Sequence, residues 1–480
     1  MPATQSHEKS GARRVTPNLV SVTTINQDGS RKFLHPADSQ GRFMRWRRMV
    51  AFLLMVIYIA LPWIPVNGYP AVFLDVAERR FHFFGLTLAA QDMWLGFFLI
   101  TGLAFSLFIV TSFLGRIWCG WTCPYTVFLE HVYRRIERLI DGDAPARKKL
   151  DDAPWGLEKV TKRVLKHGIF VLLSLGIAHV FLSYFVSIRQ LYAWMHGPPS
   201  QHTLAFGVVL FLTAGLYFAF SWFREQFCII LCPYGRLQSA LTDDNTVVIG
   251  YDQKRGEPRG KAGTAGAGAC VNCHRCVQVC PTGIDIRNGL QLECIGCAAC
   301  VDACDDIMTK LDRPKGLVRY DSFNGFRGGK TRFIRARTIA YMFFAALGLA
   351  AFSMSLSTLK PMRVLAKRMQ GLPYFVSDGT VRNQFNIRIL NERQTAASYT
   401  ITLDPASVPQ GMRMVGAEEP VRVPPLGEVV KPVFIAIPQT EYNASQPIRI
   451  LVSETGGASQ AKQEVEFLGP DLRYVQMPPH

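Results

Sequence analysis

The chain has 480 residues, too many for one hydrophobic core, so several domains are expected. Its hydrophobic content of 49% and positive mean hydropathy are high for a soluble protein. The formal net charge of +17 would suit a nucleic-acid binder, but the basic residues do not cluster in one soluble domain, so nucleic acid is not an expected partner.

Five apolar runs approach the length of a membrane span, at 49–66, 93–114, 168–188, 204–223 and 338–359. The segments before and between these runs hold 9, 2, 11, 1 and 17 Lys plus Arg residues. This alternation is the positive-inside pattern. It predicts a multi-pass membrane protein with a cytoplasmic basic N-terminal segment at 1–48, cytoplasmic loops at 115–167 and 224–337, and an exported C-terminal part. The stretch 69–90 is expected to be a loop at the membrane surface.

The first four runs form a membrane region at 49–237 that carries the same motif twice. The sequences "WCGWTCPY" and "FCIILCPY" follow the second and fourth runs, and they supply Cys119 and Cys123, then Cys228 and Cys232. On a helix each pair would lie on one face. The repeat predicts two pseudo-symmetric hairpins whose four thiols meet near the cytoplasmic surface. Such thiols suit copper, a further cluster or dithiol exchange, which the spacing does not rank, and buried structural cysteines are the alternative.

A Gly/Ala-rich linker is expected at 238–268, before a cysteine-rich domain at 269–312. Eight cysteines there repeat the C-x2-C-x2-C-x3-C spacing of bacterial ferredoxins with two 4Fe–4S clusters. Because the last cysteine of each run serves the other cluster, one set is predicted as Cys270, Cys273, Cys276 and Cys304, and the other as Cys294, Cys297, Cys300 and Cys280. Small residues between these ligands (Gly296, Ala298, Ala299) leave room for backbone N–H groups to point at sulfur. Paired zinc sites are the alternative.

The region after the fifth run changes character. From 374 to 470, short alternating strands separated by Pro, Gly, Asn and Asp predict an immunoglobulin-like β-sandwich, and this region holds no cysteine. The expected fold is therefore a multi-domain membrane protein: a five-span α-helical bundle, an inserted double 4Fe–4S ferredoxin-like domain and a C-terminal sandwich. All twelve cysteines lie in or beside the cytoplasmic loops, which favours metal ligands or redox groups over disulfides.

This order of motifs resembles the cytochrome c oxidase accessory proteins of the CcoG (FixG/RdxA) family, over about 42–469. The stretches that carry the resemblance are "RIWCGWTCPYTVFLE", "FCIILCPYGRLQS", the double cluster motif and the β-rich tail. The spans, thiol motifs and clusters are more loosely similar to NapH and NosR membrane ferredoxins. The resemblance implies a bacterial inner-membrane protein that aids assembly of a cbb3-type oxidase by reducing Cu(II) to Cu(I) for copper delivery. Oxidase subunits or copper-assembly proteins would then be its partners.

Three functions follow as hypotheses. The first is a cupric reductase in oxidase assembly, supplied by an unidentified electron donor. The second is an electron relay between the quinone pool and a redox partner, as in NapH, for which the sequence offers only Gln91 and Asp92 as polar residues at the outer end of a span. The third is a non-catalytic assembly scaffold whose clusters only stabilise the fold.

Overall fold

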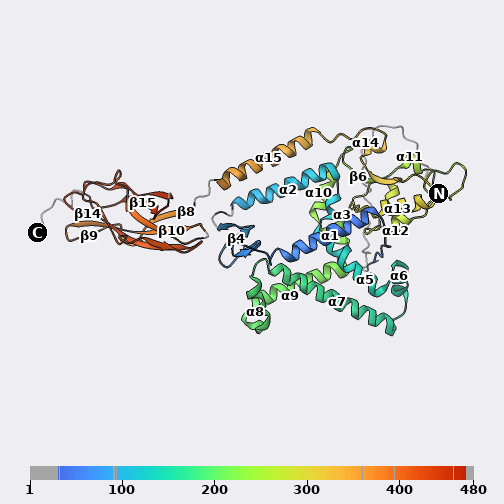
Figure 1. Cartoon of the computed structure of the whole chain (residues 1–480), viewed down its shortest axis with the longest axis horizontal. Helices are drawn as coiled ribbons and strands as arrows, with labels where there is room; N and C mark the ends of the chain where they lie inside the picture. The colour runs from blue at the N-terminus through green and yellow to red at the C-terminus, as the bar shows by residue number, and fades with distance from the viewer. Residues whose placement is uncertain are drawn as a thin grey trace, which may run out of the picture. The chain divides into compact units, whose positions relative to one another are not determined.

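The computed structural model describes residues 31, 33–89, 92, 94–357, 361–393, 395–457 and 459–471. The chain divides into two compact units, Met1–Phe352 and Ser353–His480, and each is described by itself (Figure 1). Most of the predicted N-terminal segment, Gln91 and the end of the fifth predicted run lie outside the described residues.

Among the described residues, four helices are long and apolar enough to cross a membrane: α2 (Trp94–Leu114), α7 (Leu157–Leu182), α9 (Thr203–Phe218) with its continuation η4 (Ala219–Phe223), and α15 (Ala336–Ser357). Little of their apolar surface is buried, as expected for helices that face lipid. The first predicted run lies in α1 (Arg42–Ala60), which is not among these four. Four arginines in its first two turns and the prolines beyond its end shorten its apolar part, so the five-span count is not confirmed.

The long helices pack in pairs. Helices α2 and α15 lie side by side in Figure 1, and aromatic contacts join them, with ring centroids of Phe105 and Phe344 6.0 Å apart. Helices α7 and α9 form a second pair with its own small apolar core around Ala178 and Val209. Helix α8 (Ile188–His196) and the short η3 (Pro199–Gln201) connect α7 to α9.

The prediction that 69–90 forms a surface loop is wrong, because this stretch is mostly strand. It contains an antiparallel sheet of β3 (Val72–Asp75), β4 (Arg80–Phe83) and β5 (Leu86–Ala89), preceded by the short pair β1 (Pro65–Val66) and β2 (Tyr69–Pro70). Its charged residues Asp75, Glu78, Arg79 and Arg80 sit in and beside the turn between β3 and β4, where Asp75 faces Arg80. A tight turn with charged residues between apolar strands is a hairpin signal that the sequence already carried.

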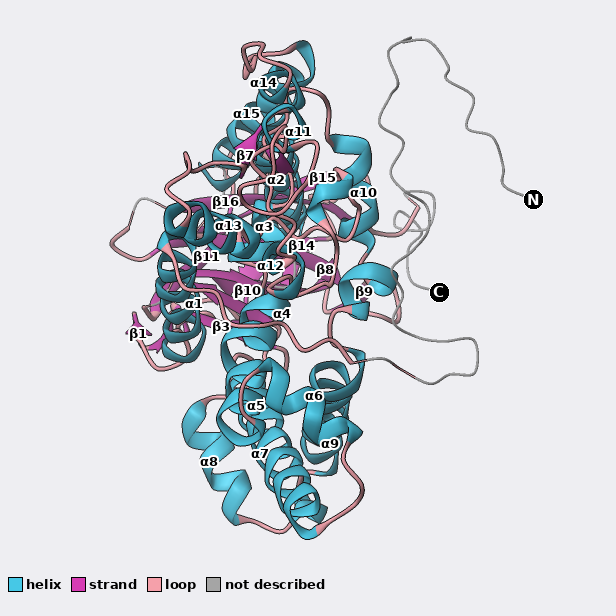
Figure 2. Cartoon of the chain, turned by 90° about the vertical axis from the view of Figure 1, so that its right-hand side faces the viewer, coloured by secondary structure: helices cyan, strands magenta, loops and turns pink. Residues whose placement is uncertain are grey.

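Short helices fill the rest of the first unit, and helices dominate it (Figure 2). They are α3 (Ile117–Trp121), α4 (Pro124–Phe128), η2 (Leu129–Tyr133), α5 (Arg134–Asp141), α6 (Ala144–Asp152), η5 (Phe227–Leu231), α10 (Pro233–Leu241), α11 (Gln253–Gly256), α12 (Arg275–Gln278), η6 (Ile286–Asn288), α13 (Ala299–Lys310) and α14 (Phe323–Phe326).

The cysteine-rich module is closed by a strand pair. Strand β6 (Val248–Tyr251) precedes the cysteines and pairs antiparallel with β7 (Val318–Asp321), which follows them. The folded module therefore extends beyond the predicted 269–312. The predicted linker at 238–268 includes the end of α10, β6 and α11, whereas its Gly/Ala-rich part from 257 to 268 has neither helix nor strand.

This module is joined to the N-terminus of α1 by one carboxylate. Asp302, on α13 between two cysteines, accepts hydrogen bonds from the backbone N–H groups of Phe43 (3.2 Å) and Met44 (2.7 Å). It therefore caps the first turn of α1, where unpaired N–H groups and the helix dipole favour an anion. Gly41 allows this approach, because a Cβ there would lie 2.2 Å from the Asp302 carboxyl carbon.

The second unit is a β-sandwich, as predicted. One sheet has the order β12–β14–β10–β8 with β9 also on β10, and the other has the order β13–β11–β15–β16. Along β10 buried and less buried residues alternate, and Phe385, Tyr399, Ile435 and Phe467 lie in the core between the sheets. The strands are β8 (Met362–Arg368), β9 (Phe375–Ser377), β10 (Thr380–Asn391), β11 (Ala397–Leu403), β12 (Arg413–Val415), β13 (Val421–Val423), β14 (Glu428–Pro438), β15 (Gln446–Glu454) and β16 (Gln460–Phe467).

Candidate functional site

Two cavities in the cysteine-rich module each gather four of the predicted ligands. The first is lined by Cys270, Cys273, Cys276 and Cys304, together with Tyr251 and Arg287. The second is lined by Cys280, Cys294, Cys297 and Cys300, and Cys276 of the first set lines it as well. The last cysteine of each run thus lies with the three cysteines of the other run. His274, which lies between two of the cysteines, is exposed and contacts Arg287.

The backbone between these cysteines explains how the thiols converge. Gly296 and Ala298 have positive φ values of 65° and 59°, a conformation that turns successive N–H groups towards one side of the loop. The N–H groups of Gly296 and Ala299 donate hydrogen bonds to the thiols of Cys294 and Cys297. These are two of the three small residues expected to leave room for such bonds. Hydrogen bonds to sulfur are one of the means by which a protein sets the potential of a cluster.

The chemistry of the two sets of thiols suits iron–sulfur clusters. Burial, followed by the nearby thiols, raises the pKa of Cys304 to about 12. In the second cavity burial likewise raises the pKa of Cys294 to about 12 and that of Cys297 to about 11. Four thiolates so close together need positive charge between them, which irons supply. Within the described residues, no three His, Cys, Asp or Glu side chains are placed to hold a single ion.

The four thiols of the repeated motif also come together. The Cys119 thiol interacts electrostatically with Cys123 and Cys232, and the Cys228 thiol interacts with the other three. Burial is the main cause that raises the pKa of Cys119 to about 12. The Cys119 sulfur lies 3.9 Å from Oε1 of Gln238. We call these four cysteines the membrane thiol group.

The i, i+4 spacing would place each pair on one face of a continuous helix, but the helix is interrupted at the second cysteine of each pair. Cys119 lies in α3, but Cys123 is the residue before α4 and has an extended conformation with ψ of 122°. Cys228 lies in η5, and Cys232 has a matching ψ of 111° before α10. Proline follows both second cysteines, and it disfavours helical geometry in the residue before it. The helix therefore breaks at the same place in both motifs.

The tyrosine of each motif contacts the helix that precedes the other motif. Tyr125, which follows Cys123, donates hydrogen bonds to the carbonyls of Ala219 (2.9 Å) and Arg224 (2.6 Å) at the end of the fourth predicted run. Tyr234, which follows Cys232, bonds through its hydroxyl to Thr111 at the end of the second (2.6 Å). Each tyrosine thus reaches the helix that precedes the other motif. This reciprocity agrees with the pseudo-symmetry expected from the repeat.

The membrane thiol group and the second cysteine cavity share a wall. Gly120, next to Cys119, packs on the loop of the cavity so closely that a Cβ would lie 2.6 Å from the carbonyl oxygen of Ile295 and 2.8 Å from Cα of Cys297. The buried Arg47 donates to the Gly120 carbonyl (2.6 Å), and its charge favours the Cys297 thiolate. Arg116 donates to the carbonyls of Leu292 and Gly235, so it joins the cavity loop to the second motif.

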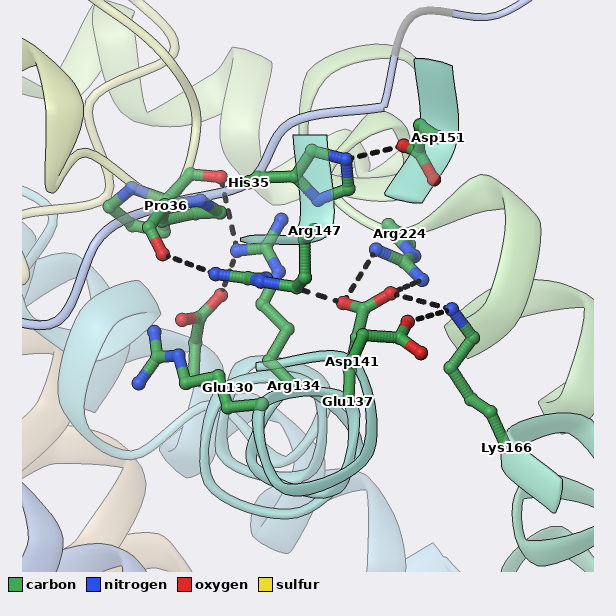
Figure 3. A network of polar contacts seen from close by, with 12 residues as sticks. His35, Pro36, Glu130, Arg134, Glu137, Asp141, Arg147, Asp151, Lys166 and Arg224 are labelled. Carbon is green, nitrogen blue, oxygen red and sulfur yellow. Dashed lines mark hydrogen bonds and ion pairs between the residues drawn. The ribbon is translucent and has the colours of Figure 1, made fainter. Parts of the chain in front are cut away.

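A buried ion network joins the helix after the first motif to the start of the second motif and to the cysteine-rich module (Figure 3). Arg134 pairs with Glu130 and with Glu225 (2.7 Å), and it donates to the carbonyl of Pro281 (3.1 Å), the residue after Cys280. Glu137 accepts two hydrogen bonds from Arg224, at 2.9 and 3.1 Å. Other members of the network are Arg31, Asp141, Arg147 and Lys166. Burial opposes ionisation of Glu137, but Arg224, Lys166 and Arg147 outweigh it and hold its pKa below the usual range.

Sequence reasoning found the twelve cysteines but missed these supporting residues. Arg47, Arg116, Gln238 and Asp302 each contact a segment at least 73 positions away. No local spacing marks such contacts. The one available signal was the presence of charged residues inside otherwise apolar or ligand-bearing segments, since a buried charge needs a partner.

Comparisons with known proteins agree with this arrangement. Residues 223–323 match a family described as a 4Fe–4S dicluster domain, 95–142 match a 4Fe–4S binding domain, and 352–470 match the IG-like fold at the C-terminal of FixG. The chain is 34% identical to the nitrogen fixation protein FixG of Rhizobium meliloti, over 88% of this chain and 90% of the relative. It belongs to the FixG/RdxA family.

Two further relatives have similar sequences. Protein RdxA of Cereibacter sphaeroides is 33% identical over 88% of this chain and 94% of its own length. The ferredoxin-type protein NapH of Haemophilus influenzae is 24% identical over 56% of this chain and 89% of its own length. With its apolar helices and dicluster domain, the chain is therefore a membrane iron–sulfur electron-transfer protein. The match at 95–142 contains Cys119 and Cys123 as its only cysteines, so the repeated motif falls inside a cluster-binding family as well.

Proposed function

We propose that this protein passes electrons to Cu(II) and supplies Cu(I) for assembly of a cbb3-type cytochrome c oxidase. The observation that carries the proposal is the wall shared by the membrane thiol group and the second cysteine cavity, at Gly120 and Cys297. It places soft sulfur ligands for copper directly beside a candidate electron store. Copper is the substrate here, and the soft thiolates of the membrane thiol group favour Cu(I) over Cu(II).

The ligand sets follow the two cavities. Cys270, Cys273, Cys276 and Cys304 would hold one 4Fe–4S cluster, and Cys280, Cys294, Cys297 and Cys300 the other. Such clusters supply single electrons, and reduction of one Cu(II) consumes one. Cys273 is exposed, whereas the three second-run cysteines of the other cavity are buried or nearly so. The first set is therefore the side open to a soluble partner, and the second is the side next to the membrane thiols.

Two arginines would stabilise the reduced state of the second set of thiols. Arg47 and Arg116 place positive charge near Cys297 and Cys294, which stabilises the extra negative charge of a reduced site. The membrane thiols are not placed to hold one ion as the structure stands. Copper would therefore be bound with a rearrangement of these side chains, or reduced while held by fewer of them.

The topology is part of the proposal. With α1 counted as a fifth span, the basic loops lie in the cytoplasm of a bacterium and the sandwich lies in the periplasm. The outward face of α1 supports this count, because Met49, Phe52, Leu53 and Val56 are all largely exposed. The sandwich, which has no cysteine, would then dock oxidase subunits or copper-assembly proteins.

One experiment tests the function directly. Protein purified without oxygen would be assayed for iron, sulfide and copper, and for reduction of Cu(II) after treatment with dithionite. We expect about eight irons and eight sulfides per chain, and Cu(I) production that a variant lacking all four membrane thiols has lost. Equal Cu(I) production by this variant would refute the role of the membrane thiols, and zinc in place of iron would refute the clusters.

A further inference from the structure

The two cysteine runs share a backbone conformation at two places but face different surroundings. In the second run Gly296 and Ala298 have φ values of 65° and 59°, and at the corresponding places of the first run Asn272 and His274 both have a φ of 55°. Gly296 and Ala298 are buried, whereas Asn272 and His274 are exposed, as is Cys273 between them. The first set of thiols therefore opens at the protein surface through Cys273.

The surface around Cys273 is basic. Residues 254–284, which contain the first run and the loop before it, hold five basic residues and one acidic residue. Residues 305–316, on the other side of the first cavity, hold three of each. Arg287 and Asp285 pair with each other at 2.6 Å. An excess of four positive charges remains, and we call the following cations the basic rim: Arg255, Arg259, Lys261, Arg275, Arg313 and Lys315.

Backbone contacts fold the basic rim around the first cavity. The N–H group of Gly260 donates to the carbonyl of Cys270 (3.2 Å), which brings the loop that carries Lys261 beside this cysteine. Arg313 donates to the carbonyls of the two residues before Cys270, at 3.2 and 2.9 Å. Arg275 lines the cavity itself. The cations are thus gathered at the surface where the first set of thiols opens.

The charge of the basic rim is directed to solvent. Arg255, Arg275 and Arg313 donate to backbone carbonyls, which leave their positive charge uncompensated. Lys261 and Lys315 are exposed. A patch of one sign attracts a partner of the opposite sign and raises its rate of association by about 10- to 1,000-fold at low salt.

The same surface lacks the apolar side chains of a permanent interface. Among the described residues between 238 and 332, no large apolar side chain is exposed. A protein surface that enters a lipid layer would present such side chains. A polar, charged surface instead suits the brief encounters of electron-transfer proteins, which bury little area.

We propose that the basic rim docks a small acidic protein that carries one electron, and that this carrier is the electron donor of the protein. The inference rests on the proposed electron-transfer function and names the class of its donor. The carrier would lose one electron, which the cluster held by Cys273 and its three partners takes up, with no bond formed and no proton transferred. Electrons would enter at this exposed set because the other set lies against the membrane thiol group.

Two charge-reversal variants test the basic rim. Lys261→Glu combined with Lys315→Glu removes the excess of four positive charges, since each substitution changes the charge by two. Both side chains are exposed, and neither residue is a candidate cluster ligand. Lys148→Glu combined with Lys149→Glu makes the same total change at exposed positions of α6, outside the cysteine-rich module. Iron content checks that each variant holds its clusters.

The first measurement is the affinity of an oxidised acidic plant-type ferredoxin for the full chain in phosphatidylcholine nanodiscs. The second is the rate at which the reduced ferredoxin bleaches the cluster absorbance. In the wild type and the α6 variant we expect both to fall as salt rises. In the rim variant we expect at least a tenfold loss of both at low salt and almost no salt dependence. Photoreduced deazariboflavin, which is uncharged, should bleach all three proteins equally.

Equal affinities and rates in the rim and α6 variants would overturn the inference, as would faster reduction of the wild type at higher salt. A basic rim that binds anionic lipid instead would also overturn it. In that case phosphatidylglycerol nanodiscs would slow the reduction of the wild type by ferredoxin more than that of the rim variant.

These outcomes differ from failure of the proposed function. If ferredoxin reduces the clusters with the expected dependence on charge but no Cu(I) is formed, the copper role fails and the docking surface stands. If protein reduced by dithionite forms Cu(I) while reduction by ferredoxin is insensitive to the basic rim, the docking surface fails and the copper role stands.

Discussion

The buried ion network offers a sharp test of how the second thiol motif is held. In Glu137→Gln the side chain keeps its shape and loses its charge. Among the fully buried members, five cations (Arg31, Arg134, Arg147, Lys166, Arg224) face four carboxylates (Glu130, Glu137, Asp141, Glu225) in the wild type, so the net charge of this buried set rises from +1 to +2. All of these side chains are at least nine-tenths buried.

The expected loss is large because the partners stay buried. Arg224 loses both of its charged hydrogen bonds to Glu137, and Arg147 and Lys166 lose ion pairs of 3.6 and 3.3 Å. Removing one partner of a buried pair costs about 3–5 kcal/mol, since the remaining charge is left uncompensated. We expect a decrease of that size in the free energy of unfolding, measured by titrating detergent-solubilised protein with SDS.

A surface pair gives the control. Glu158→Gln removes the exposed partner of Lys162 and should leave the unfolding transition unchanged. A double-mutant cycle of Glu137→Gln with Arg224→Gln should show strong non-additivity, because the second change removes the charge that the first one stranded. A loss below about 1 kcal/mol for Glu137→Gln would mean that water or rearrangement compensates the network, and the reasoning from buried charge would fail.

Glu137 makes the free energy of unfolding depend on pH in a definite direction. The pKa of Glu137 is lowered by Arg224, Lys166 and Arg147 in spite of burial, so the folded protein binds its proton less readily than the unfolded chain does. This stabilisation is complete above the ordinary glutamate pKa, about 4.3, and is lost as the pH falls from there towards the lower folded value. The Glu137→Gln variant should lack this part of the acid sensitivity.

Three other predictions concern the thiols, the topology and the module. Cys119→Ser should lose about as much Cu(II) reduction as the variant lacking all four membrane thiols, because the effects of substitutions in a site that acts as a unit are non-additive. Full activity in either variant would mean that these thiols serve only to pack the helices. A reporter that works only outside the cytoplasm should be active when fused after Ser357 and inactive at Gly263, and the reverse would invert the topology. Asp302→Ala should lower the free energy of unfolding by about 1 kcal/mol through loss of the α1 cap, and no change would show that water replaces it.

The sequence predicted those features that depend on spacing along the chain. Cysteines two or three residues apart can only occupy one loop, so the two gatherings of thiols followed from the pattern. The sandwich followed from the alternation that β10 preserves. The helix break at Cys123 and Cys232 also follows from the sequence, because proline restricts the residue before it.

Features that depend on contacts across the chain could not be predicted in the same way. Arg134 bonds to Glu225 and to Pro281, which lie 91 and 147 positions away. Nothing in the local composition of the helix around Arg134 distinguishes a buried arginine from a solvated one. An apolar cavity lined by Leu54 of α1, Ile177 of α7 and Leu212 of α9 is a further case, since each of these helices has the sequence of an ordinary lipid-facing or core segment, and the space exists only where they meet.

The exchanged tyrosine contacts suggest why the motif is repeated at all. Because Tyr125 binds the end of one membrane helix pair and Tyr234 binds the end of the other, neither motif can adopt its observed conformation without its counterpart. The membrane thiol group is thus formed by pairing, and the short helices α3 and α10, which carry Gly120 and Gly235, then present one surface to Arg116 and the second cysteine cavity. A single copy would leave two thiols and half of this wall. Duplication therefore accounts both for the four thiols and for the place where the iron–sulfur module meets the membrane region.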